Sequence, residues 1–129
     1  MTNRHTEQLT AAIDRAVREV LARGLQDPRV SGLITVTEVR LSPDLREADI
    51  GVTVLPLEKE PLTLHGLQSA AAHIRREVGD LVHTRQMPVL RFRADHTVRK
   101  QAALLRDLDR ARADLEARER GSSGEEATS

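Results

Sequence analysis

The sequence has 129 residues, twenty acidic and twenty basic side chains, and no cysteine. This length suits one domain with one hydrophobic core, and the lack of cysteine excludes disulfide bonds, a thiolate nucleophile and a cysteine-rich zinc site. No apolar run approaches the roughly 20 residues that cross a bilayer, and the N-terminal residues lack the apolar region of a secretion signal. We therefore expect a cytoplasmic protein that does not bind membranes.

The first half of the sequence predicts a helix followed by a β-hairpin. Apolar residues recur at helical spacing over residues 4–23, and Gly24 follows where a C-terminal cap is expected. Residues 33–41 are rich in β-branched side chains and residues 46–55 alternate between apolar and polar, with a turn-like Ser-Pro-Asp-Leu between the two segments. The apolar phase changes within the first strand, which predicts a β-bulge near Glu38.

The second half predicts a long helical region, a short strand and a last helix. An apolar stripe covers about residues 62–83, and residues 89–94 alternate as a third strand. A last helix is expected from about Thr97 to Glu119, and the final nine residues have the composition of a disordered tail.

The order of these elements is that of a type II KH domain, provided that residues 62–83 form two helices with a break between them. KH domains hold single-stranded nucleic acid at a Gly-x-x-Gly loop between two such helices. The sequence has Ser69-Ala70-Ala71-Ala72 at this place instead. Because alanine is the best helix former, helix propensity alone predicts an unbroken helix.

Positive charge is concentrated in one part of this neutral chain. Residues 73–106 contain eight Lys or Arg and three Asp or Glu, a net charge of +5. Such a concentration is the usual footprint of a nucleic-acid contact, although a solvated helix face has the same pattern. Phe92 is the only aromatic residue, which argues against base stacking on aromatic platforms. An RNA contact would therefore depend on charge and backbone.

Several short motifs resemble those of bacterial ribosome-binding factor A. They are Asp-Pro-Arg at 27–29, Thr-Val-Thr at 35–37, Ser-Pro-Asp-Leu at 42–45, Ser-Ala-Ala-Ala-His-Ile-Arg at 69–75 and Arg-x-x-Pro-x-Leu-x-Phe-x-x-Asp at 85–95. The resemblance covers about residues 6–106. It implies a type II KH-like α+β fold in which a kink at residues 70–72 replaces the glycine loop. Ala72 stands where the family has glycine, which Ala tolerates if the kink has αR or bridge geometry.

The same resemblance implies a function. It implies a ribosome assembly factor that binds the 30S subunit and its 16S rRNA. Such a factor promotes late small-subunit maturation, including processing of the 5′ end of 16S rRNA, and supports growth in the cold.

The candidate RNA contacts lie around the kink, along the third strand and at the start of the last helix. Arg75 and Arg76 follow the kink and are the strongest candidates, joined by the backbone amides of residues 70–72 if a second helix begins there. Arg91 and Arg93 share the polar face of a strand with carboxylates of the neighbouring strand, so cross-strand ion pairs are a competing use. The candidates are Ser69, Ala70, Ala71, Ala72, His73, Arg75, Arg76, Arg85, Arg91, Arg93, Arg99 and Lys100.

The sequence gives little support for a metal site or a catalytic site. His65 and His73 are about 12 Å apart along a helix, too far to share one zinc ion. The strand carboxylates have no accompanying nucleophile or phosphate loop. Turn chemistry explains Asp27 to Arg29, and a contact role for Arg29 is the weaker interpretation. We expect no catalysis, no metal and no cofactor.

The sequence therefore predicts three segments. They are a KH-like RNA-binding domain at 1–106, a charged helical extension at 107–120 and a disordered tail at 121–129. We expect a monomer. Two functions stay open: an assembly factor for the small ribosomal subunit, and a small α+β protein-interaction module whose basic face meets an acidic partner.

Overall fold

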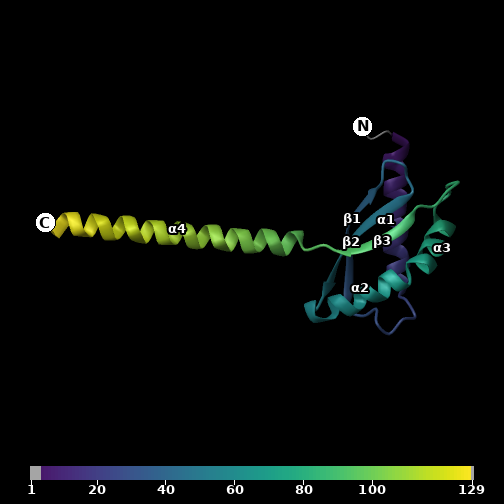
Figure 1. Cartoon of the computed structure of the whole chain (residues 1–129), viewed down its shortest axis with the longest axis horizontal. Coiled ribbons are helices and arrows are strands. Elements are labelled where there is room, and N and C mark those ends of the chain that lie inside the picture. Colours follow the sequence, from purple (N-terminus) through teal and green to yellow (C-terminus); the bar gives the residue numbers. More distant parts are fainter. Residues whose placement is uncertain (1–3, 129) are drawn as a thin grey trace. The chain divides into compact units, whose positions relative to one another are not determined.

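The computed structural model describes residues 4–128, with side chains as far as Gly121. The chain forms two compact units that divide after Asp95. The elements of the first unit are α1 (Arg4–Arg23), β1 (Leu33–Leu41), β2 (Glu47–Leu55), the 3-10 turn η1 (Leu57–Lys59), α2 (Glu60–Ser69), α3 (Ala71–Leu81) and β3 (Val89–Ala94). The second unit is α4 (Thr97–Thr128) (Figure 1).

The first unit is a sheet with helices on one face. Its strand order is β1-β2-β3, with β1 antiparallel and β3 parallel to β2. Strand alternation turns every second side chain of β2 inward, so that Ala48, Ile50, Val52 and Val54 are fully buried. Most of these join the apolar stripes of α1, α2 and α3 in one core. The other buried members are Leu9, Ile13, Ala16, Val17, Val20, Val36, Leu67, Ile74, Val78, Val82, Leu90 and Phe92.

The predicted elements of this unit agree closely with the structure. α1 ends at Arg23, and Gly24 follows at a φ of 86°, a left-handed conformation that glycine adopts at low cost. β3 has the predicted residues, and β2 begins one residue later than predicted. The order α-β-β-α-α-β confirms the type II KH-like α+β class.

The predicted β-bulge is confirmed in β1. The register with β2 shifts between Val36 and Glu38. Ile34 and Val36 before the bulge, and Val39 and Leu41 after it, therefore all pack on the core. The extra residue explains why the apolar phase of this strand changes along the sequence.

The long helical region is broken at Ala70, which confirms the break that the resemblance implied. α2 ends at Ser69 and α3 begins at Ala71, while Ala70 has a φ of −90° and a ψ of 2°. This is the bridge region, which alanine can adopt, and Ala72, which stands at the glycine position of the family, lies within α3. Leu67 and Ile74, on either side of the break, are both fully buried in the same core. Their burial outweighs helix-propensity differences of under about 1 kcal/mol per residue.

α4 (Thr97–Thr128) extends beyond its predicted end at Glu119. The tail predicted to be disordered, 121–129, is helical through Thr128 and so differs from the prediction, while Ser129 lies outside the described residues. Opposite charges three and four residues apart stabilise this helix as far as Arg120. None of the described helices is both long and apolar enough to span a bilayer.

Candidate nucleic-acid interface

A groove of about 430 Å³ lies between β3 and the junction of α2 with α3. Both helices pack on β3, so the break falls beside this edge strand. Gln68, in the last turn of α2, donates from Nε2 to the carbonyl oxygen of Phe92 at 3.3 Å. The groove is lined by Asp49, Gln68, Ala71, Leu90, Arg91, Phe92 and Arg93. Four of these seven side chains are polar or charged, and the other three are apolar.

Small and polar side chains are exposed around the break. They belong to Ser69, Ala72, His73 and Arg76. Ala70 and Ala71 are half-buried. The amide of Ala70 donates to the carbonyl oxygen of Gly66 at 2.9 Å, so the prediction that this amide is available to a ligand is wrong. The exposed side chains, rather than the amide of Ala70, form the accessible part of the break.

Arg75 holds the loop that leads into β3. Its Nε donates to the carbonyl oxygen of Pro88 at 3.0 Å, and its Nη2 donates to that of Met87. The side chain is half-buried, whereas that of Arg76 is exposed. Arg76 is therefore the better placed of the two arginines that were predicted to contact RNA.

The two arginines of β3 are paired with carboxylates on the open face of the sheet. Arg91 Nη2 lies 2.7 Å from Glu47 Oε1. Arg93 Nε lies 2.7 Å from Asp49 Oδ2, and its Nη2 lies 2.8 Å from Glu38 Oε2. The hydrogen bond to Asp49 is the main cause that raises the pKa of Arg93. The structure therefore contains the cross-strand ion pairs that the sequence analysis set against an RNA contact for Arg91 and Arg93.

Gly51 allows Arg93 to lie across β2. A Cβ at Gly51 would stand 3.2 Å from each Nη atom of Arg93 and 2.9 Å from Thr37 Oγ1. Thr37, at the bulge, donates to Asp95 Oδ2 at 2.6 Å. These contacts tie the three strands together and neutralise much of the charge on the open face. The exposed Arg76 beside the helix break is therefore the better candidate for contact with a polyanion.

The loop between α1 and β1 reaches the break, which the sequence analysis missed. Asp27 Oδ1 accepts from the backbone amide and Nε of Arg29 at 2.9 and 3.0 Å, and Oδ2 accepts from Nη2 at 2.7 Å. Arg29 Nη1 also donates to Ser69 Oγ at 3.4 Å. The hydrogen bonds from the Arg29 side chain, then from its backbone, lower the pKa of Asp27 to about 2. The turn chemistry is as predicted, but no sequence signal indicates the contact across forty residues.

The remaining candidates are divided between the two units. Arg85 is exposed in the loop between α3 and β3, whereas Arg99 and Lys100 are exposed on α4. His73 Nε2 lies 3.3 Å from Glu77 Oε1 in the next turn of α3. The described residues contain no cluster of three His, Cys, Asp or Glu that could hold a metal ion.

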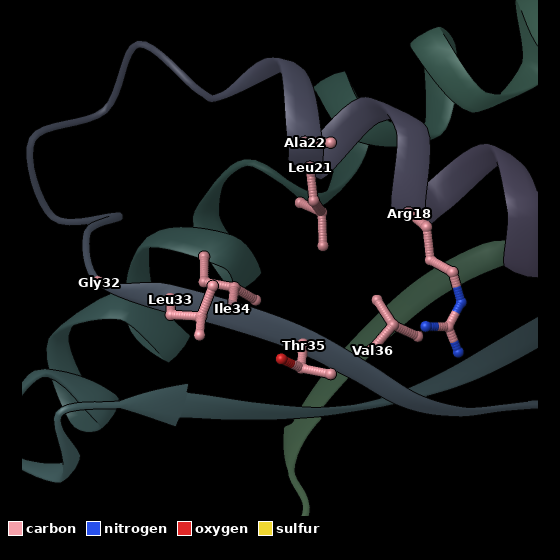
Figure 2. Close-up of a pocket in the computed structure, with 8 residues that line it drawn as sticks. All are labelled: Arg18, Leu21, Ala22, Gly32, Leu33, Ile34, Thr35 and Val36. Atoms are coloured by element: carbon pink, nitrogen blue, oxygen red, sulfur yellow. The ribbon is translucent and has the colours of Figure 1, made fainter.

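A second groove lies at the opposite edge of the sheet, between α1 and β1 (Figure 2). Figure 2 shows Leu21 of α1 pointing toward the strand, with Arg18 farther along. Arg18 is the only charged side chain of its lining, and its Nε lies 2.6 Å from Asp14 Oδ1. This groove is mainly apolar, and its single charged side chain is paired with Asp14, so it offers little to a polyanion.

The fold and the helix break define a type II KH-like domain in which an alanine segment replaces the glycine loop. A sequence model described as ribosome-binding factor A matches residues 5–108. This chain belongs to the ribosome-binding factor A family.

Individual relatives agree with this assignment. Ribosome-binding factor A of Acetivibrio thermocellus is 39% identical over 97 residues, which are 74% of this chain and 79% of the relative. The crystal structure of ribosome-binding factor A from Thermus thermophilus has a TM-score of 0.60 and 31% identity, covering 68% of this chain and 92% of that chain. A homology model of the Thermus thermophilus factor, fitted into a cryo-EM map of its 30S complex, has a TM-score of 0.58 and 30% identity, covering 69% of this chain and 93% of that chain.

Proposed function

We propose that this chain binds the 30S ribosomal subunit through 16S rRNA and promotes late small-subunit maturation, including processing of the 5′ end of 16S rRNA. The observation that carries the proposal is the break at Ala70, which interrupts the helical region next to the groove along β3. Family membership, and the 30S complex of the Thermus thermophilus relative, support the ribosome as the partner.

Binding depends mainly on the RNA backbone. Arg76 and Arg85 are exposed cations that can neutralise phosphates, and each neutralised phosphate makes log K fall with log salt by about 0.7 to 0.9. Phe92 is 4% exposed and is the only aromatic residue, so base stacking contributes little. The isolated chain is therefore expected to have weak sequence preference.

The proposed role is binding without catalysis. The chain acts as a monomer in the cytoplasm, needs no cofactor, and matters most in the cold, when misfolded rRNA is slow to rearrange. A basic face for an acidic protein partner is the competing function.

Co-sedimentation tests the proposed function in the native organism. The chain is expected to migrate with free or immature 30S subunits in preference to complete ribosomes, and to dissociate as salt is raised. Deletion of the gene is expected to accumulate 16S rRNA with an unprocessed 5′ end, more strongly in the cold. Absence of both effects, together with capture of an acidic protein, would favour the competing function.

A further inference from the structure

The α1–β1 loop carries an arginine whose orientation is fixed. Arg29 donates from Nε and Nη2 to the two carboxylate oxygens of Asp27, at 3.0 and 2.7 Å. These two groups form the side edge of the planar guanidinium. The outer edge, formed by Nη1 and Nη2, has the 3.4 Å contact with Ser69 Oγ, and the side chain of Arg29 is 37% exposed. The outer edge can therefore donate to a second pair of oxygen atoms.

α2 holds this loop in place from behind. Thr63, which is fully buried, donates from Oγ1 to the carbonyl oxygen of Ser31 at 2.9 Å. Gly66 lets the loop approach closely, because a Cβ there would stand 2.7 Å from Val30 Cγ2 and 3.2 Å from Arg29 Cβ. The backbone of Arg29 is thus held against α2 by this hydrogen bond and by close packing, next to the end of the helix.

The two-pronged pairing of Arg29 with Asp27 is not a necessary result of the Asp-x-Arg turn sequence. Asp44 and Arg46 have the same spacing in the hairpin turn, and the amide of Arg46 also donates to Asp44 Oδ1, at 3.1 Å. There the arginine Nε lies 3.9 Å from Asp44 Oδ2, and the side chain of Arg46 is 77% exposed. A turn of this kind does not require the two-pronged pairing that Arg29 shows.

We propose that Arg29 is a further RNA contact, whose Nη1–Nη2 edge binds a backbone phosphate with Ser69 Oγ as a second donor. Asp27 is the positioning residue that aims the guanidinium. A planar guanidinium matches two phosphate oxygens at once, which an ammonium group cannot do. This assignment rests on the proposed binding of RNA at the helix break, and it makes the α1–β1 loop part of the interface.

Equilibrium binding of the full chain to purified 16S rRNA over a range of salt concentrations tests the assignment. Arg29→Gln is expected to weaken binding about tenfold and to lower the salt slope by about 0.7 to 0.9. Arg29→Lys keeps the charge but loses the fork, so the slope is expected to persist while binding stays about threefold weaker than wild type. Arg46→Gln removes an arginine from the matched turn and is expected to change neither quantity.

The outcomes separate this assignment from the proposed function. Failure of the wild-type chain to bind 16S rRNA overturns the proposed function and the assignment with it. Wild-type binding with an unchanged Arg29→Gln, or an equal loss in Arg46→Gln, overturns the assignment alone. Full affinity in Arg29→Lys overturns the two-pronged contact. Thermal unfolding verifies that each variant is folded, and Arg29→Lys carries the test if Arg29→Gln does not fold.

Discussion

Gly66→Ala is expected to lower the free energy of unfolding by about 1 to 3 kcal/mol, although alanine is the better helix former. Gly66 is buried in α2, and its Cβ would stand 2.7 Å from Val30 Cγ2. Real Cβ atoms do not approach so closely, and Arg29 Cβ would also stand 3.2 Å away, so we expect the α1–β1 loop to shift with Val30. The same shift moves Arg29 away from Ser69, so weaker binding to 16S rRNA is expected as well.

Gly79→Ala is the matched control in α3. Its Cβ would meet only Met87 Cγ, at 3.4 Å, which is ordinary van der Waals contact. The variant is therefore expected to gain roughly 0.5 to 1 kcal/mol from helix propensity. Urea unfolding followed by circular dichroism measures both changes. Equal stabilisation by the two substitutions would show that α2 and the loop are not closely packed.

Arg75→Gln and Arg76→Gln are expected to separate stability from RNA binding. Arg75→Gln loses two charge-assisted hydrogen bonds to the loop before β3, which lowers the free energy of unfolding by about 2 kcal/mol. Its folded fraction still binds 16S rRNA normally. Arg76→Gln leaves stability within about 0.5 kcal/mol, because the side chain is exposed. It weakens RNA binding about tenfold and lowers the salt slope by about 0.7 to 0.9.

The neighbouring positions control for each other, since each variant removes one arginine from the same turn of α3. Urea unfolding and filter binding at several salt concentrations give the two readouts. Charge reversal at both positions would not separate stability from RNA binding, because it also breaks the loop contacts of Arg75. A tenfold loss of binding by folded Arg75→Gln, with none by Arg76→Gln, would exchange the roles assigned here.

Much of the fold was predictable because local patterns and tertiary packing favour the same structure. The apolar phase change in β1 indicates a bulge, since both halves of the strand must face one core. The break at Ala70 is different, because helix propensity opposes it. It is the burial of Leu67 and Ile74 on one core that decides the conformation, and a pattern of single residues does not reveal this. Only the resemblance to a family predicted it.

The candidate site was harder to predict because its contacts join residues far apart in the sequence. The positive segment around α3 and β3 was visible from composition, but the partners of each arginine were not. Arg93 reaches Glu38 on β1 only because Gly51 leaves room on β2. Arg75 donates to backbone carbonyl oxygens of the loop before β3, and Arg29 donates to Ser69, which is forty residues away in the sequence. Net charge along a sequence does not distinguish such paired arginines from accessible ones.

Site-specific photo-crosslinking to immature 30S subunits tests most directly whether the helix break faces rRNA. Two exposed helical alanines allow a matched comparison: Ala72 follows the break, whereas Ala22 lines the groove at the opposite edge of the sheet. With a photoreactive side chain at each position in turn, we predict strong crosslinks to 16S rRNA from position 72 and weak or absent ones from position 22. Crosslinks to 16S rRNA from position 22 alone would contradict the account.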